Sequence, residues 1–255
     1  MRLHSDTDQK RDHAPECIDA GRELMRSLAF RRNDVRQSYR LEIIAQACLG
    51  GLDGAAMAQE VCRKLKESIA KYETYANDHN RLLQGLLTVQ PAAVLDGLFA
   101  SDSADPGVGI RIFQDLIQHQ TNPIDLVSKE ELARWCDQDP AIRYPIAAAI
   151  VTAFTRADGK ALPKWTETAL YLLEKAPERV KVLELFVRRF IPMSWSGSRA
   201  TIVESNARLL DDLEGYPDPS VVEIVAREKK RLTSVVQAER RAETLADSRR
   251  DERFE

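Results

Sequence analysis

Apolar residues recur every three or four positions along most of this chain, which is the spacing of an amphipathic α-helix. The segment 54–77 shows the pattern clearly, because its apolar stripe is backed by a charged face. No run alternates apolar and polar residues with the period of two that a half-buried strand needs. The pattern therefore predicts an all-α protein. The stripe of segment 54–77 consists of Met57, Val61, Leu65, Ile69 and Tyr72.

Helix-breaking and helix-capping residues divide this pattern into separate helices. Pro15 fits the first position of a helix, and Ser128 with Glu131 forms a capping box at the start of another. The segment 140–157 is apolar nearly all round, so we expect its helix to be the most buried, with Pro145 kinking or dividing it. Further helices start or stop at Pro91, Pro163, Pro177, Pro192 and Gly215.

The chain is expected to have three parts. Residues 1–14 are polar and lack a period, which predicts a disordered lead. Residues 15–218 form a helical array. Residues 219–255 contain no Gly, and no Pro after the first residue, and therefore predict one long charged helix of roughly 55 Å at ~1.5 Å per residue.

Three of the helices are expected to begin with Asp-Pro, at Asp105, Asp139 and Asp218. Asp accepts hydrogen bonds from the free N–H groups of a first helical turn, and Pro has no N–H to leave unpaired there. The first two starts are 34 residues apart, and the last two are 79 apart, about two units of ~40. This spacing suggests an internal repeat.

The stretch DPAIRYPIA, from Asp139, resembles the second helix of a HEAT repeat, which commonly begins Asp-Pro-x-Val-Arg-x-x-Ala. The later stretch DPSVVEIVA departs from it, with Val222 where the motif has Arg. The resemblance implies antiparallel helix pairs stacked into a HEAT-like α-solenoid. An irregular helical bundle is the alternative. The positions expected to face inward are Ile142, Ala147, Val221 and Ala226.

A looser resemblance covers residues 85–255. Several short stretches resemble the C-terminal helical region of large bacterial multidomain proteins. These stretches are QPAAVLDGLFA, TETALYLLEKAPERVKVLE, SWSGS and RDERFE. Some of those proteins carry NTPase or other effector domains upstream, and some belong to defence systems. The resemblance implies a part or relative of a larger bacterial assembly whose catalytic parts lie elsewhere.

Charge, hydropathy and cysteine content limit the binding partners and the cellular location that we expect. The chain has 37 Lys and Arg against 40 Asp and Glu, so its net charge of −3 gives no strong attraction to nucleic acids or membranes. The longest apolar run, 146–154, is too short to span a bilayer. Four cysteines without a C-x-x-C pair, and no signal peptide, predict a cytoplasmic location.

The sequence offers no recognisable catalytic motif. Its four histidines are scattered, and it contains neither H-E-x-x-H nor G-x-S-x-G. Its carboxylate pairs lie on polar helix faces. We therefore expect no catalytic residue, no cofactor and no metal site, and a protein that is not an enzyme.

One loop stands out as a candidate interaction site. Trp195 lies in the short polar stretch 194–198, where Gly197 is suited to an unusual backbone angle and Ser198 to capping the next helix. The ring either fills the seam between two helices, which we favour, or binds a partner. Trp135 and Trp165 are expected in the core.

The long last helix is the second candidate. The first half of its apolar stripe packs on the rest of the chain, which we favour, or the stripe is covered by a partner helix. From residue 223 onward the last helix carries nine basic and eight acidic residues, which is too balanced to favour nucleic acid. We expect a non-catalytic scaffold or sensor that binds a protein or upstream domains of a larger chain, with oligomerisation possible through this helix. A nucleic-acid-binding helical repeat protein is the alternative, and an enzyme with an unfamiliar site is a third possibility. The candidate protein-interaction residues are Trp195, Ser196, Arg199, Leu232, Val236 and Arg240.

Overall fold

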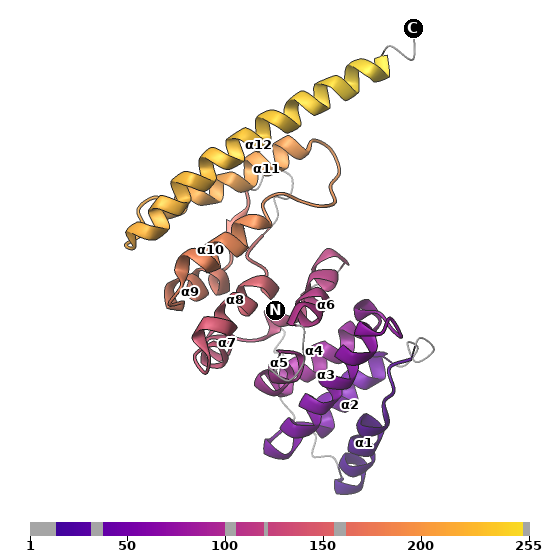
Figure 1. The fold of residues 1–255 in the computed structure, drawn as a ribbon. Coiled ribbons are helices and arrows are strands. Elements are labelled where there is room, and N and C mark those ends of the chain that lie inside the picture. The colour runs from indigo at the N-terminus through magenta and orange to yellow at the C-terminus, as the bar shows by residue number, and fades with distance from the viewer. Residues whose placement is uncertain (1–13, 32–37, 100–105, 120–121, 156–161, 252–255) are drawn as a thin grey trace, which may run out of the picture. The chain divides into compact units, whose positions relative to one another are not determined.

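The described part of the chain is all-α. It contains twelve α-helices, and its strands are limited to one antiparallel pair of two residues each (Figure 1). A computed structural model of the protein describes residues 14–31, 38–99, 106–119, 122–155 and 162–251. The expected disordered lead, apart from Ala14, and the Asp-Pro start at Asp105 lie outside these ranges.

Two compact units divide the chain, unit 1 at Met1–Val127 and unit 2 at Ser128–Glu255. The division falls inside the range 15–218 that the sequence placed in one array, and the last helix belongs to unit 2. Each unit is described by itself below.

Unit 1 is a group of helices that approach one another closely at two glycines. A Cβ on Gly85 of α4 would lie 2.7 Å from the backbone oxygen of Glu42 on α2. A Cβ on Gly97 of α5 would lie 2.5 Å from the backbone oxygen of Gln59 on α3. The absence of these side chains lets α2 pack on α4 and α3 on α5. The elements are α1 (Pro15–Ser27), α2 (Ser38–Cys48), η2 (Leu52–Gly54), α3 (Ala55–Ala70), η3 (Ala76–His79), α4 (Asn80–Val89), α5 (Pro91–Phe99), α6 (Pro106–His119) and η4 (Pro123–Leu126).

Unit 2 is built from successive helix pairs. α7 contacts α8, α9 contacts α10, and α11 contacts α12. Neighbouring pairs also meet, because α7 contacts α9, α8 contacts α10 and α10 contacts α12. The elements are α7 (Lys129–Cys136), α8 (Pro140–Ile150), β1 (Phe154–Thr155), β2 (Lys164–Trp165), α9 (Glu167–Lys175), α10 (Arg179–Arg188), α11 (Arg199–Ala207), η5 (Arg208–Leu213) and α12 (Pro219–Asp251).

The expected capping box at the start of α7 is confirmed. The Ser128 hydroxyl accepts a hydrogen bond from the Glu131 amide at 3.2 Å and donates one to the Glu131 carboxylate at 3.0 Å. The helix therefore begins where this pair satisfies its first free N–H group.

The expectation that α8 is the most buried helix is wrong, because six of its eleven residues are buried against six of ten in α4, and α8 ends at Ile150 rather than continuing to 157. Pro145 lies inside it and does not divide it. The expected inward pairs of the HEAT resemblance are wrong in one member each, because Ile142 is 57% exposed and Ala226 is exposed, whereas Ala147 and Val221 are buried. Members of each pair are five positions apart, about 140° around a helix, so a core on one side covers only one of them.

The chain around Trp165 is a strand, not the expected start of a helix. Phe154 pairs with Trp165 and Thr155 with Lys164. α9 begins only at Glu167, where the Thr166 hydroxyl caps it. The Trp165 ring lies 5.8–5.9 Å from two phenylalanine rings and its N–H donates to the Leu209 carbonyl at 2.8 Å, but the residue is half-buried rather than in the core as expected. Trp135 is buried, as expected.

The long last helix is confirmed. α12 has 33 residues, or about 50 Å (Figure 1). Asp218 accepts a hydrogen bond from the Ser220 amide at 3.0 Å and so caps its start. Lys229 holds α12 to the preceding turn through ion pairs with Asp211 and Glu214. The apolar side of α12 is buried as far as Val236, and none of the side chains described beyond that point is buried.

Candidate functional site

A groove of about 300 Å³ lies in unit 2 where α10 and α12 pack together. It combines guanidinium and carboxylate groups with one aliphatic side chain at its edge. We call it the arginine groove and define it by its lining residues Glu184, Arg188, Ile191, Glu228 and Arg231.

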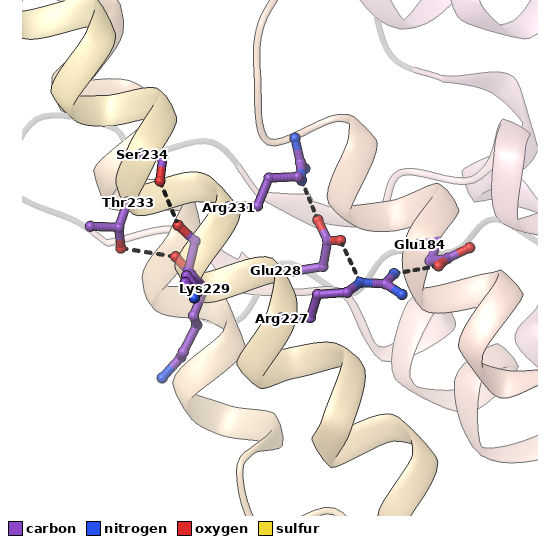
Figure 2. A network of polar contacts seen from close by, with 8 residues as sticks. Glu184, Arg227, Glu228, Lys229, Arg231, Thr233 and Ser234 are labelled. Carbon is purple, nitrogen blue, oxygen red and sulfur yellow. Dashed lines mark hydrogen bonds and ion pairs between the residues drawn. The ribbon is translucent and has the colours of Figure 1, made fainter.

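Glu228 organises this groove. Its carboxylate is only 9% exposed and accepts hydrogen bonds from Arg231 at 2.6 Å and from Arg227 at 3.3 Å. Arg227 also donates to Glu184 on α10 at 2.5 Å, and this hydrogen bond raises the pKa of the Arg227 guanidinium (Figure 2). Removing a carboxylate from water costs several kcal/mol, and the attraction of its ion-pair partners offsets a cost of that order. The network therefore fixes two arginines by satisfying one buried acid.

Arg188 also lines the groove, but its environment differs from that of Arg227 and Arg231. Its side chain is exposed, and no described residue forms an ion pair or hydrogen bond with it. Three arginines thus meet two glutamates in and beside the groove, and the uncompensated positive charge lies on Arg188. Such a groove favours one anionic group.

The second feature is the tryptophan loop, residues 192–198 between α10 and α11. Gly197 has a φ of +80°, which L side chains rarely adopt. Ser198 caps α11 by accepting a hydrogen bond from the Thr201 amide at 3.1 Å. Both of these features agree with the sequence analysis.

α12 holds the end of this loop. The Glu243 carboxylate accepts hydrogen bonds from the Ser198 hydroxyl at 2.9 Å and from the Ala200 amide at 3.1 Å. These bonds, that of Ala200 first, lower the pKa of Glu243. A carboxylate at a helix N-terminus also interacts favourably with the helix dipole. The far half of α12 thus serves as part of the capping structure of α11.

Trp195 lies on the surface of this loop. Its side chain is 47% exposed, so the favoured expectation that it fills the seam between helices is wrong. The Arg199 guanidinium lies 4.4 Å from the ring centroid and forms a 2.7 Å ion pair with Glu239 on α12. Arg199 therefore supports the ring from one side and links it to α12. Met193, which is 84% exposed, adds apolar surface nearby in the sequence.

The predicted interaction residues divide into two groups. Trp195 and Arg199 are in contact, Ser196 is exposed beside them in the loop, and Arg240 forms an ion pair with Glu204 on α11. The prediction that Leu232 and Val236 contact a partner is wrong, because both side chains are buried against the rest of the chain. Their apolar stripe on α12 is covered by the protein itself.

The sequence analysis missed Glu228 and Arg188. A signal was present for Glu228, since it falls three positions after Val225 and four before Leu232, within the apolar stripe of α12. A charged residue in that register indicates a buried, paired acid. Arg188 had no such signal, because its importance depends on which neighbours remain unpaired.

Within the described part of the chain, no group of three or more His, Cys, Asp or Glu could hold a metal ion. Nor does any of its helices have the length and apolar character needed to cross a membrane. Comparison of the chain with protein families, curated proteins and solved structures finds no match.

Proposed function

We propose that this chain is a non-catalytic protein-binding module, and that unit 2 docks a partner protein or another domain of a larger bacterial assembly. The observation that carries the proposal is the exposed Trp195, held on a loop that is fixed at its end by Glu243 and supported by Arg199. Tryptophan and arginine are the residue types most enriched in binding hot spots.

The rigidity of the loop supports this role. Hydrogen bonds to Glu243 and the ion pair between Arg199 and Glu239 order the surface before any partner arrives. A preordered surface loses less conformational entropy on binding, and so more of the contact energy appears as affinity. An exposed Trp that served only the fold would not need this support.

We also propose that unit 2 is a HEAT-like stack of helix pairs rather than an irregular bundle. The support is the order of its contacts, in which each pair touches the next through α7 and α9, α8 and α10, and α10 and α12. Stacked pairs create extended surfaces that suit protein binding, and this step from architecture to role is an analogy.

Nucleic-acid binding is less well supported by the charges of α12. Four of its cations form ion pairs with carboxylates of the chain, which reduces the positive charge available to phosphates. Retention on heparin that falls steeply with salt would favour this alternative. The paired cations are Arg227, Lys229, Arg231 and Arg240.

A quantitative pull-down tests the proposal. Tagged full-length protein, its Trp195→Ala variant and a matched Leu170→Ala variant are incubated with lysate of the source organism, and captured proteins are quantified by mass spectrometry. Leu170 is the control because it is a partly exposed apolar residue of unit 2 on a different helix, α9.

The expected result is a protein captured by wild type and Leu170→Ala but reduced more than about tenfold with Trp195→Ala, as removal of a hot-spot residue implies. Equal capture by all three proteins, or no protein enriched over the tag alone, would contradict the proposal. Circular dichroism of each variant checks that the loss does not reflect unfolding.

A further inference from the structure

The arginine groove and the tryptophan loop both contact α12. Their chemistry and their separation along this helix indicate which groups a partner needs in order to bind both. Glu228 and Arg231 mark the groove on α12, and Glu239 marks the support of the tryptophan ring. These positions are eleven and eight residues apart, which corresponds to about 12–16 Å along the helix. An extended peptide covers that distance in four or five residues at ~3.3 Å each.

We propose that the partner contributes an extended acidic peptide to this surface. One of its carboxylates binds Arg188 in the arginine groove, and an aromatic or large aliphatic side chain four or five residues away rests on Trp195 and Met193. This inference rests on the proposed function and names the chemistry of the ligand.

Charge decides the first contact. Glu228 neutralises Arg231 and shares Arg227 with Glu184, so Arg188 is the groove's uncompensated cation. Guanidinium groups bind carboxylates in a bidentate geometry that combines charge with two hydrogen bonds. A single side-chain carboxylate of the partner would neutralise the charge of Arg188.

The same charges discriminate against phosphate monoesters. A phosphate monoester carries close to two negative charges, whereas a nucleic-acid phosphodiester carries one, and in this groove the monoester would lie near the carboxylates of Glu184 and Glu228. Ile191 adds an apolar wall that suits the hydrocarbon part of an amino-acid side chain rather than a nucleic-acid backbone. The groove therefore fits one peptide carboxylate better than a phosphodiester chain.

Apolar surface decides the second contact. Trp195 and Met193 are both largely open, and the face of Trp195 that contacts Arg199 is already used. An apolar side chain of the partner would cover the remaining aromatic surface, while Arg199 holds the ring in place.

The test uses the full chain and a library of random twelve-residue peptides displayed on phage. Selected peptides are synthesised with a fluorophore, and their affinities for wild type and variants are measured by fluorescence anisotropy. The variants are Arg188→Ala and Arg188→Glu, with Arg208→Ala as the matched control, because Arg208 is another exposed arginine of unit 2 for which no described partner exists.

We expect the selected peptides to share an acidic residue four or five positions from an aromatic or large aliphatic one. Arg188→Ala should weaken binding at least tenfold, and Arg208→Ala by less than twofold. Replacing the peptide's acidic residue with Lys should abolish binding to wild type and restore part of it to Arg188→Glu. That rescue distinguishes a direct contact from a general loss of structure.

Three results would overturn the inference. They are selected peptides that share no acidic position, binding of the peptides by Arg188→Ala as tight as by wild type, and Arg188-dependent binding of single-stranded DNA that is tighter than binding of the peptides. If a Trp195-dependent partner is nevertheless captured in the pull-down, the proposed function stands and only the acidic ligand is wrong.

Discussion

Replacing Leu232 with Ala should destabilise unit 2 by about 3 kcal/mol, whereas the same change at Leu245 should have little effect. Leu232 is fully buried and Leu245 is 60% exposed, although both lie on α12. Removing the buried methylene groups costs about 0.8 kcal/mol each, and the cavity left behind brings Leu→Ala changes to roughly 2.7–5 kcal/mol. For Leu245 the lost burial is small, and we expect a change below about 0.5 kcal/mol.

Urea unfolding, followed by circular dichroism at 222 nm and by tryptophan fluorescence, measures the effect. With a slope of about 2 kcal/mol per M, the midpoint of the Leu232→Ala variant should fall by roughly 1.5 M. All three tryptophans belong to unit 2, so fluorescence follows that unit specifically. A shift below about 0.5 M, or an equal shift for Leu245→Ala, would refute the view that only the first half of α12 is packed.

Three further predictions follow from individual contacts. The hydrogen bond from the Ala200 amide, and after it that from the Ser198 hydroxyl, lower the pKa of Glu243. The carboxylate therefore stabilises the folded protein fully above its ordinary pKa of about 4.3, and this stabilisation is lost as the pH falls through the lower pKa of the folded state. Glu243→Gln should therefore melt below wild type at pH 7 and equally with it near pH 3, and an equal gap at both would contradict the cap. A thiol reagent should modify one cysteine rapidly in the native protein, since Cys17 is exposed and the other three are buried; Cys17→Ser should remove that fast phase, and its persistence would place the reactive thiol elsewhere. Gly97→Ala should lower the melting temperature of unit 1, because its Cβ would lie 2.5 Å from a backbone oxygen of α3, whereas the Cβ of Gly50→Ala would lie 4.0 Å from its nearest neighbour and should not; equal melting of the two would show that the approach is looser than described.

The helical class and the long last helix could be predicted because they depend on local patterns. The apolar spacing of α3 and the absence of Gly or a later Pro after Pro219 are properties of short stretches. The capping box at Ser128 and the cap at Ser198 are equally local, and both are confirmed. Such features need no knowledge of the tertiary contacts.

The candidate site could be predicted only in part, because its features depend on contacts between distant residues. Trp195 was identified, but its support depends on the ion pair between Arg199 and Glu239, which are 40 residues apart. The short strand at Trp165 was missed because two residues are too few to show a period. Leu232 and Val236 were assigned to a partner because a sequence shows that a stripe is apolar but not which surface covers it.

The cap that Glu243 places on α11 gives this protein an order of assembly during synthesis. Residues 198–207 leave the ribosome well before residue 243, so the nascent α11 must wait for its carboxylate partner. A chain interrupted before that residue would carry Trp195 and Arg199 but would lack the carboxylate that caps α11. On the function proposed above, such incomplete products would bind the partner less tightly, because their loop lacks this cap.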